Sequence, residues 1–442
     1  MAFFFLYLVE GVPLGFTATA IATQMRRQDV GVEAIGAFVA SLYLPWAFKW
    51  AVGPIVDVFS SDRFGRRRVW IVVMQLLMVA TLMVAYPIDF VGQLPLFTAI
   101  IFCHNLFAAT MDVAIDALAV NVLPAEERGV ANGVMFSGAY LGIAVGGSGV
   151  LFLAPVIGFP PTYFAVAALI LLVTLFIALP LREEPRAVVP PRGPSRFQTI
   201  RREMAGFVRD SAKAFLGSRG AFIGLIFALL PAGAYALGLA LQSNLAVELG
   251  LSDPQVATLN LWTAIASAIF CVIGGWISDR IGRRLALGLF IFAMSVPTMI
   301  LAWQMQQAGW VMPVSITMPD RPIPSALLVQ QFWIASIAYA VFNGLMYGTR
   351  SALFMDVTVP RVAATQFTAY MALLNFAIAY SARWQGAALA RWGYPVTLAL
   401  DAALGLACLL LLPWMTRRQA PAPVIEDPED SEEEPEGDPG IP

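Results

Sequence analysis

The feature that most constrains this chain is a series of apolar runs of the length that an α-helix needs to cross a lipid bilayer. One crossing takes about 20 residues, because the hydrocarbon core is about 30 Å thick. We place twelve such runs and therefore predict an all-α membrane protein with twelve transmembrane helices. The runs lie within residues 3–23, 34–56, 69–87, 95–121, 130–153, 162–180, 221–247, 256–277, 286–305, 327–350, 364–385 and 395–415.

Composition argues against a soluble protein and against an enzyme. Of the 442 residues, 59% are hydrophobic and 13% are charged, which is far more apolar than a soluble domain. Cys103, Cys271 and Cys408 all fall inside apolar runs, where each is expected to pack as a small hydrophobic residue. No catalytic or metal-ligand constellation has a usable spacing. We expect no enzymatic activity, no metal or cofactor, no nucleic-acid partner, and a monomer embedded in lipid.

The distribution of basic residues predicts the orientation of the chain. Loops on one side of the predicted helices carry twenty arginines and lysines, and loops on the other side carry four. Because basic loops stay in the cytoplasm, both termini are expected there, in a multi-pass protein of the cytoplasmic (inner) membrane. The adjacent pair Arg26 and Arg27 runs against this trend.

The two halves of the chain repeat each other. Residues 12–24, VPLGFTATAIATQ, align with residues 230–242, LPAGAYALGLALQ, at an offset of 218. This duplication predicts two six-helix pseudo-repeats, an arrangement in which transporters place a substrate site between the repeats. The predicted organisation is a six-helix bundle at 1–181, a linker at 182–219, a second bundle at 220–416 and a tail at 417–442.

The linker and the tail have distinct compositions. Phe197, Ile200, Met204 and Phe207 recur near helical spacing between basic residues, as expected of a helix lying on the inner leaflet. A solvated helix that joins the two bundles is an equally good interpretation. The tail carries nine acidic residues within 425–442 and no basic ones, so we expect it to be disordered.

Two short arginine-rich loops follow the second run of each half. The first is Gly53–Arg68, GPIVDVFSSDRFGRRR, and the second is Gly275–Arg284, GWISDRIGRR. Their pattern, G-x-x-x-D-R-x-G-R-R, resembles the loop signature of the major facilitator superfamily. We interpret both as cytoplasmic gating loops, in which aspartates face arginines or a helix N-terminus and arginines anchor to anionic headgroups. The candidate gating residues are Gly53, Asp57, Asp62, Arg63, Gly65, Arg66, Arg67, Arg128, Gly275, Asp279, Arg280, Gly282, Arg283 and Arg284.

Ionisable residues inside the apolar runs are the best functional candidates, because each costs about 2.5–3.5 kcal/mol to insert. Asp112 and Asp116 lie four residues apart and share a helix face, so they are not expected to ionise together easily. Such a pair suits proton coupling. The structural alternative is that one carboxylate pairs with Lys49 or Arg128 and the other caps the cytoplasmic end. Glu10, in a glycine- and proline-rich stretch, and His104 complete the proton-coupling candidates.

A second group of polar residues is expected to line the substrate pathway. Lys49 and Arg350 favour an anionic or zwitterionic substrate, although they can equally serve to neutralise Asp112, Asp116 and Asp356. Tryptophans can stack on rings, but they anchor to the membrane interface more often. The pathway candidates are Lys49, Trp46, Asn105, Asn343, Tyr347 and Arg350.

Several motifs of the first half resemble those of one group within the superfamily. The group comprises the AmpG-type muropeptide permeases, the acetyl-CoA transporters and the related siderophore permeases. The resemblance implies that the two aspartates of the fourth helix serve transport and that Lys49 matches the lysine of the second. It rests on LPWAFKW at 44–50, GPIVD at 53–57, FGRRRVW at 64–70 with Gln75, MDVAIDA at 111–117 and VLPAEERG at 122–129.

These observations lead to one functional hypothesis and two alternatives. We expect an alternating-access carrier, driven by the proton gradient, that imports an amphipathic, partly anionic small molecule resembling a muropeptide, a siderophore or an acyl-CoA. The first alternative is an exporter of drugs or metabolites. The second is a non-transporting assembly or sensor protein of the same fold, which predicts a filled central cavity.

Overall fold

The computed structural model describes residues 2–59, 65–122, 128–181, 183, 196–217, 219–357 and 363–415. Within these ranges the chain is helical, as predicted, and has no strand. Eight of the described helices are long and apolar enough to cross a membrane, and two shorter apolar helices accompany them. The predicted tail and the loop residues Asp62 and Arg63 lie outside the described residues.

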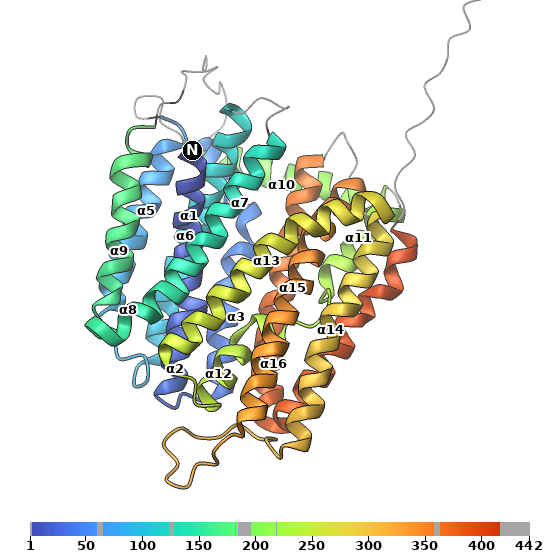
Figure 1. Ribbon diagram of the computed structural model, residues 1–442. Coiled ribbons are helices and arrows are strands. Elements are labelled where there is room, and N and C mark those ends of the chain that lie inside the picture. Colours follow the sequence, from blue (N-terminus) through green and yellow to red (C-terminus); the bar gives the residue numbers. More distant parts are fainter. Residues whose placement is uncertain are drawn as a thin grey trace, which may run out of the picture.

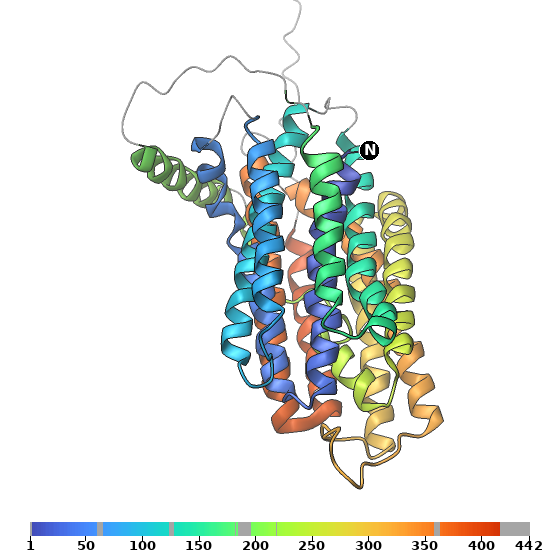
Figure 2. The same cartoon turned by 90° about the vertical axis from the view of Figure 1, so that its left-hand side faces the viewer.

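The helices pack side by side as a bundle, with their axes roughly along one direction (Figures 1 and 2). In chain order they are α1 (Ala2–Gly15), η1 (Phe16–Ile21), α2 (Ala22–Arg27), α3 (Val32–Ala47), η2 (Lys49–Ala51), α4 (Gly53–Val58), α5 (Arg68–Ala85), α6 (Leu94–Val122), α7 (Arg128–Ala144), η3 (Val145–Gly149), α8 (Val150–Ile157), α9 (Thr162–Val173), η4 (Thr174–Ala178), α10 (Arg196–Leu216), α11 (Arg219–Leu229), η5 (Ala236–Gly238), α12 (Ala240–Glu248), α13 (Asp253–Ile281), α14 (Arg283–Gln307), α15 (Ala326–Val357), α16 (Ala363–Ala407) and η7 (Cys408–Trp414).

Glycines of α7 and of η3, which continues it, bring this run into backbone contact with α1 in the first half. A Cβ atom on Gly142 would lie 2.1 Å from the carbonyl oxygen of Leu8, and one on Gly146 would lie 2.0 Å from that of Val12. Gly138 meets α1 in the same way one turn earlier. Small residues at four-residue spacing allow helices in lipid to approach closely, where dispersion rather than the hydrophobic effect drives packing. In the second half, Gly344 and its neighbours give α13 and α15 a similar contact.

The seventh predicted run, residues 221–247, is broken in its middle rather than continuous. Helix α11 stops at Leu229, and α12 begins only at Ala240. Pro231 lacks a backbone N–H, and Gly233 takes a positive φ of 86°, which ends a helix. The freed backbone groups find partners on α16: the N–H of Gly233 donates to Gly405 O at 2.9 Å.

Two other runs depart from simple helices. The run at 34–56 is divided near Lys49, where α3 gives way to the short helices η2 and α4. Helix α16 bends at Gly393, where φ is 76°, so it consists of two helices that correspond to the predicted runs at 364–385 and 395–415. The amphipathic helix α10 lies apart from the bundle axis, beside α4 and α16 (Figure 2).

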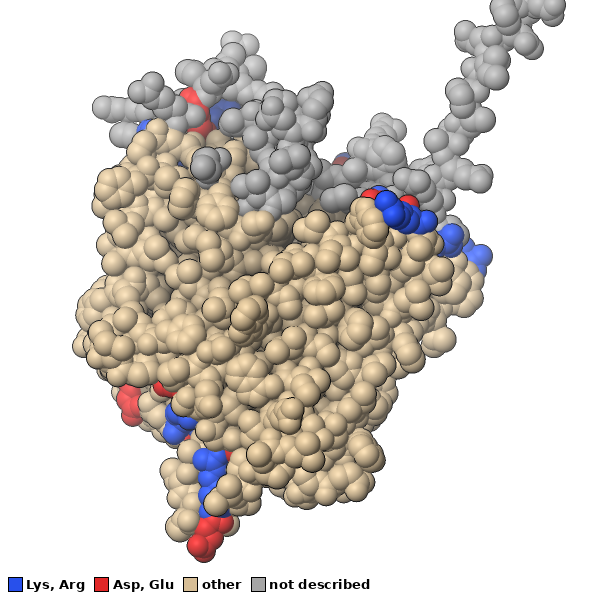
Figure 3. All heavy atoms as spheres, viewed as in Figure 1, with Lys and Arg blue, Asp and Glu red and all other residues tan. Residues whose placement is uncertain are grey.

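The two ends of the bundle are distinct. We call one the arginine-loop end, after Gly65–Arg68 and Gly282–Arg284. The other is the sealed end, after the turn at 28–31 and the connection at 308–325. The face seen in Figure 3 is almost free of charge between the two ends, where basic and acidic side chains gather. Such an uncharged belt suits a bilayer between two aqueous phases.

Candidate functional site

A cavity of about 350 Å³ lies between the two halves of the molecule, and it is lined by residues of α1, α3, α7, α15, α16 and the broken segment before α12. It brings together most of the residues predicted to serve the substrate pathway, with Glu10 added from the proton-coupling group. Those that line it are Glu10, Trp46, Lys49, Asn343, Tyr347 and Arg350. A cavity of this size falls in the range of small-molecule sites.

A second chamber, of about 210 Å³, continues from this cavity toward the sealed end. The two share Tyr43, Tyr140, Tyr339 and Asn343 in their walls. The residues that line only the second chamber include hydroxyl and amide side chains, for example that of Gln242. None of them is charged. The molecule therefore encloses a charged chamber nearer the arginine loops and a neutral polar chamber nearer the sealed end.

A cluster in which carboxylates outnumber cations reaches the charged chamber: Glu10 and Lys49 line it, whereas Asp112 and Asp116 contact Lys49 but do not line the chamber. Lys49 Nζ lies 2.6 Å from Asp112 Oδ2 and 3.8 Å from Asp116 Oδ2. The Asp112 side chain is 3% exposed, whereas that of Asp116 is 47% exposed. Glu10 lies in the electrostatic field of the same groups and has one carboxylate oxygen without a hydrogen-bond partner. We call Glu10, Lys49, Asp112 and Asp116 the acidic cluster.

Tyr7 is a member of this site that sequence reasoning missed. Its hydroxyl donates a hydrogen bond to Asp116 Oδ1 from one turn before Glu10 on α1. A tyrosine in an apolar run gives little signal, because such residues are common near membrane interfaces. Only the packing of α1 against α6 identifies this one.

Arg350 stands on the opposite wall of the cavity and has a different environment from that of Lys49. It is 3% exposed. Its Nη1 donates to the hydroxyl of Tyr235 at 3.2 Å, and its guanidinium lies 4.9 Å from the ring centroid of Tyr347. Its Nε has no hydrogen-bond partner. Among the described side chains no carboxylate forms an ion pair with it; the side chain of Asp356 is outside that set.

Asp401 is a buried carboxylate that sequence reasoning also missed. It accepts hydrogen bonds from the backbone N–H groups of Tyr235 at 2.7 Å and Ala236 at 2.8 Å, and from Gln385 Nε2 at 2.6 Å. It thereby fixes the broken segment that carries Tyr235, the partner of Arg350. An isolated aspartate in the last apolar run met the criterion applied to Asp112 and Asp116, so the signal was present.

Two predicted residues lie away from the cavity. His104 is fully buried on α6, where Nδ1 lies 2.9 Å from Thr81 Oγ1 and 3.1 Å from Met78 O. Asn105 is also fully buried and donates to Ile101 O at 3.0 Å. Both lie on α6, which also carries Asp112 and Asp116, but neither lines the two chambers. A proton relay through His104 stays a prediction.

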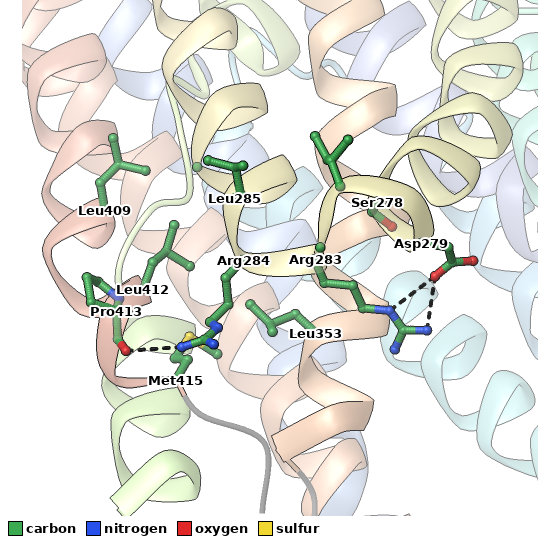
Figure 4. A pocket seen from close by; sticks show the side chains of 13 residues that line it. Ser278, Asp279, Arg283, Arg284, Leu285, Leu353, Leu409, Leu412, Pro413 and Met415 are labelled. Carbon is green, nitrogen blue, oxygen red and sulfur yellow. Dashed lines mark hydrogen bonds and ion pairs between the residues drawn. The ribbon is translucent and has the colours of Figure 1, made fainter.

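The arginine loop of the second half fastens several helices together. Arg283 pairs with Asp279 at 3.2 Å and donates to Ala352 O on α15 at 3.2 Å. Arg284 donates to Pro413 O at 3.2 Å. These contacts border a surface hollow of about 810 Å³ that is separate from the central cavity (Figure 4). Arg280 stacks on Trp276, with its Cζ 3.8 Å from the ring centroid.

The arginine loop of the first half is described in part. The backbone N–H groups of Arg67 and Arg68 donate to Glu183 at 2.9 and 2.5 Å, so a carboxylate caps the positive end of α5. Gly65 has a φ of 89°, which favours glycine. Gly53 begins α4, and Gly275 and Gly282 lie in and after α13. Nothing is described of the side chains of Asp57 and Arg128.

Arg26 and Arg27, which ran against the charge pattern, join the two halves at the sealed end. Arg26 is 3% exposed, and its Nη2 lies 2.7 Å from Oε1 of Glu248, which is fully buried. Arg27 Nε lies 2.7 Å from Asp253 Oδ1. A buried arginine such as Arg26 needs a partner of this kind. The two arginines thus join α2 to α12 and to the start of α13, which explains their departure from the charge pattern.

Further contacts across the halves surround this pair. Asp29 accepts hydrogen bonds from Ser315, from the N–H of Ile316 at 3.1 Å and from Thr317 at 3.0 Å. Partial burial acts to raise the pKa of Asp29, but these hydrogen bonds and Arg26 outweigh it, so the pKa lies below its ordinary value. Between described residues, every ion pair that joins the halves lies at this end.

Comparison with known proteins agrees with this architecture. The chain is 26% identical over 284 residues to the anhydromuropeptide permease of Escherichia coli (strain K12), which covers 64% of this chain and 55% of that protein. It therefore aligns with about half the length of that relative. It is also 23% identical over 306 residues to the putative transporter AmpG 4 of Rickettsia conorii, covering 68% of this chain and 72% of the relative.

Solved structures with the same fold include a D-xylose-proton symporter, with a TM-score of 0.67 at 12% identity over 93% of this chain and 95% of that one. A POT family transporter in complex with a thioalcohol-conjugated peptide gives a TM-score of 0.67 at 11% identity, over 94% and 96% of the two chains. A sequence profile of the Major Facilitator Superfamily matches residues 2–318 and 223–438. The chain is thus a multi-pass membrane protein that belongs to the Major Facilitator Superfamily.

Proposed function

We propose that this protein is a secondary active transporter that imports an amphipathic, partly anionic small molecule together with protons, by alternating access. The proton gradient supplies the energy without a bound cofactor, and the chain acts as a monomer in the cytoplasmic membrane with both termini inside. In that orientation the sealed end faces outward. The structure then corresponds to a state that is closed to the outside.

The observation that carries the proposal is the composition of the acidic cluster. Two carboxylates, on Asp112 and Asp116, contact one ammonium group, that of Lys49, and a third, on Glu10, lines the same cavity as Lys49. Like charges in a low dielectric disfavour full ionisation, so the cluster has the capacity to take up a proton. The 47% exposure of Asp116 gives that proton a wet route, and ionisable groups retained in a membrane mark such routes.

The central cavity favours a carrier over a non-transporting protein of the same fold. The assembly or sensor alternative predicts a filled centre, whereas both halves line the two chambers of this molecule. The substrate assignment rests on the relatives: one is named an anhydromuropeptide permease. We therefore propose a muropeptide-like substrate first, with siderophore-like and acyl-CoA-like molecules as the other members of the class.

Uptake into proteoliposomes tests the proposal. The purified protein is reconstituted, a pH gradient is imposed, and uptake of a radiolabelled anhydromuropeptide, a siderophore and an acyl-CoA is measured. We expect one of these to accumulate and the accumulation to collapse with an uncoupler. Asp112→Asn and Asp116→Asn are each expected to lower gradient-driven uptake at least tenfold, because each removes a proton-binding group. Exchange of substrate at equal pH should fall much less.

Asp320→Asn is the matched control, since Asp320 is exposed in the connection before α15 and should leave uptake unchanged. Full gradient-driven uptake in both aspartate variants would remove the pair from the coupling mechanism. Accumulation only when the gradient is reversed would favour the exporter alternative. No transport of any probe in either direction would favour the non-transporting one.

A further inference from the structure

The cavity contains one buried cation whose charge nothing in the described structure balances. Lys49 is held by Asp112 and Asp116. Arg350, on the opposite wall, donates one hydrogen bond to a neutral tyrosine and keeps Nε without a partner. Removing a guanidinium from water costs several kcal/mol unless a partner returns that energy. A buried guanidinium without a carboxylate partner is therefore suited to bind an anionic group of a ligand.

The nearby carboxylate of the same half does not fill this role. Asp401 forms no ion pair with Arg350, and its oxygens are occupied by Tyr235 N, Ala236 N and Gln385. It acts on Arg350 indirectly, because it fixes the backbone of Tyr235, whose hydroxyl receives the Arg350 hydrogen bond. The guanidinium is therefore held in position through Nη1, while its Nε makes no hydrogen bond.

The surroundings of Arg350 indicate which kind of anionic group would bind to it. A guanidinium presents a planar fork that matches a carboxylate or a phosphate. No second unpaired cation lines the described cavity, since Lys49 already serves the acidic cluster. A phosphate dianion would thus be poorly neutralised, whereas a single carboxylate is matched by one arginine. The ring of Tyr347 covers one face of the guanidinium and leaves its edge for an in-plane partner.

We propose that Arg350, positioned by Tyr235, Tyr347 and Asp401, is the subsite that binds a carboxylate of the transported molecule. The neutral chamber beyond Asn343 then receives an uncharged hydroxyl- or amide-bearing part of the same molecule. This assignment rests on the proposed transport function and deepens it. In this assignment the acidic cluster of the first half binds protons, and Arg350 of the second half recognises the substrate.

The test compares one probe in two forms on the intact, detergent-purified protein. The dissociation constant of an anhydromuropeptide with free carboxylates is measured by calorimetry beside that of its methyl ester. Wild-type protein should bind the acid at least 30-fold more tightly. Arg350→Gln should remove that preference, whereas Arg350→Lys should restore part of it. Arg391→Gln, which alters an exposed arginine outside the cavity, should keep the full preference.

The outcomes separate this assignment from the proposed function. Equal binding of acid and ester by wild-type protein overturns the subsite and leaves proton-driven transport standing. A preference that persists in folded Arg350→Gln also overturns it. If wild-type protein binds neither form, the subsite is overturned for glycopeptide acids, and the uptake experiment with the other probes decides the fate of the transport proposal. The wild-type comparison is decisive even if the Gln variant does not fold.

Discussion

At the scale of single residues, the pairing of Lys49 is the contact on which the acidic cluster depends. The chain has only two lysines, and Lys49 is the one inside an apolar run. Its ammonium group neutralises Asp112, whose side chain is 3% exposed. Removing one partner of a buried ion pair leaves the other charge without compensation, which usually costs more than the pair contributes.

Lys49→Met should therefore lower the free energy of unfolding by about 3–5 kcal/mol, measured by thermal unfolding in detergent. Asp112→Asn in the same chain should recover much of this loss, because the uncompensated charge is then absent. Lys213→Met, on the exposed face of α10, is the matched control and should change stability by less than about 0.5 kcal/mol. Unchanged stability of Lys49→Met would show that the pair is not structurally important.

The sequence predicted the members of this cluster better than their arrangement. Searching the apolar runs for charges found all four members, Glu10, Lys49, Asp112 and Asp116, and also Arg350. Pairing of Lys49 with the aspartates was one of two open interpretations. The sequence could not show that Lys49 would form an ion pair with a carboxylate, whereas Arg350 would form none with a described side chain. That outcome depends on distances across the cavity between helices far apart in the chain, and no local pattern encodes them.

At the scale of elements, the two pseudo-repeats differ where their sequences align best. Pro13 stays within α1, whereas its counterpart Pro231 lies in a break between α11 and α12. The break is stable because Asp401 and Gly405 accept its backbone N–H groups. The corresponding run of the first half, residues 162–180, has no carboxylate. Internal alignment therefore predicted the repeat but not the break, which depends on a residue 166 positions away from Tyr235.

The contact between α1 and α7 makes a prediction at the same scale. Gly142→Ala should destabilise the protein by roughly 1–3 kcal/mol, because the added Cβ would meet Leu8 O at 2.1 Å and force the helices apart. Gly149→Ala, farther along the same run, meets atoms only at 3.9 Å and should be neutral. Thermal unfolding of both variants in detergent is the measurement, and equal stability would contradict the packing described here.

At the scale of the whole molecule, the described ion pairs that join the two halves lie at the sealed end. Arg26 and Arg27 are exceptions to the positive-inside rule, because that rule counts the basic residues in each loop and does not consider their ion-pair partners. Glu248 and Asp253 belong to the other half of the chain. Arg26 and Arg27 therefore depart from the topology rule because each pairs with a carboxylate of the other half.

Asp29 sets the expected pH response of this closure. A carboxylate whose pKa is lowered in the folded state stabilises that state above its ordinary pKa, and the contribution is lost as the pH falls through the lowered value. The pKa of Asp29 lies below its ordinary value, which for aspartate is about 3.9. Its contacts with Ser315, Ile316 and Thr317 should therefore persist unchanged between pH 8 and pH 5.

Breaking the Arg26–Glu248 pair should open the sealed end. The reporter is Ser148→Cys, in the wall of the neutral chamber, in a chain whose three native cysteines are replaced. Arg26→Gln should raise its labelling by a membrane-impermeant maleimide from the sealed side at least tenfold, because about 1.4 kcal/mol lost from the closed state changes the populations tenfold and a buried pair is worth more.

The exchanged pair, Arg26→Glu with Glu248→Arg, should restore slow labelling, since the same attraction is rebuilt across the halves. Arg391→Gln is the matched control: Arg391 is exposed, and among the described residues it forms no ion pair between the halves, so its loss should leave the closure intact. Maleimide reacts with the thiolate, so all labelling slows at pH 5, but the ratio of each variant's labelling rate to that of wild type should be the same at pH 5 and pH 8, because Asp29 stays ionised over this range. If Arg26→Gln and wild type label equally slowly, the closure is held by helix packing at Gly36 and Gly386 rather than by charge.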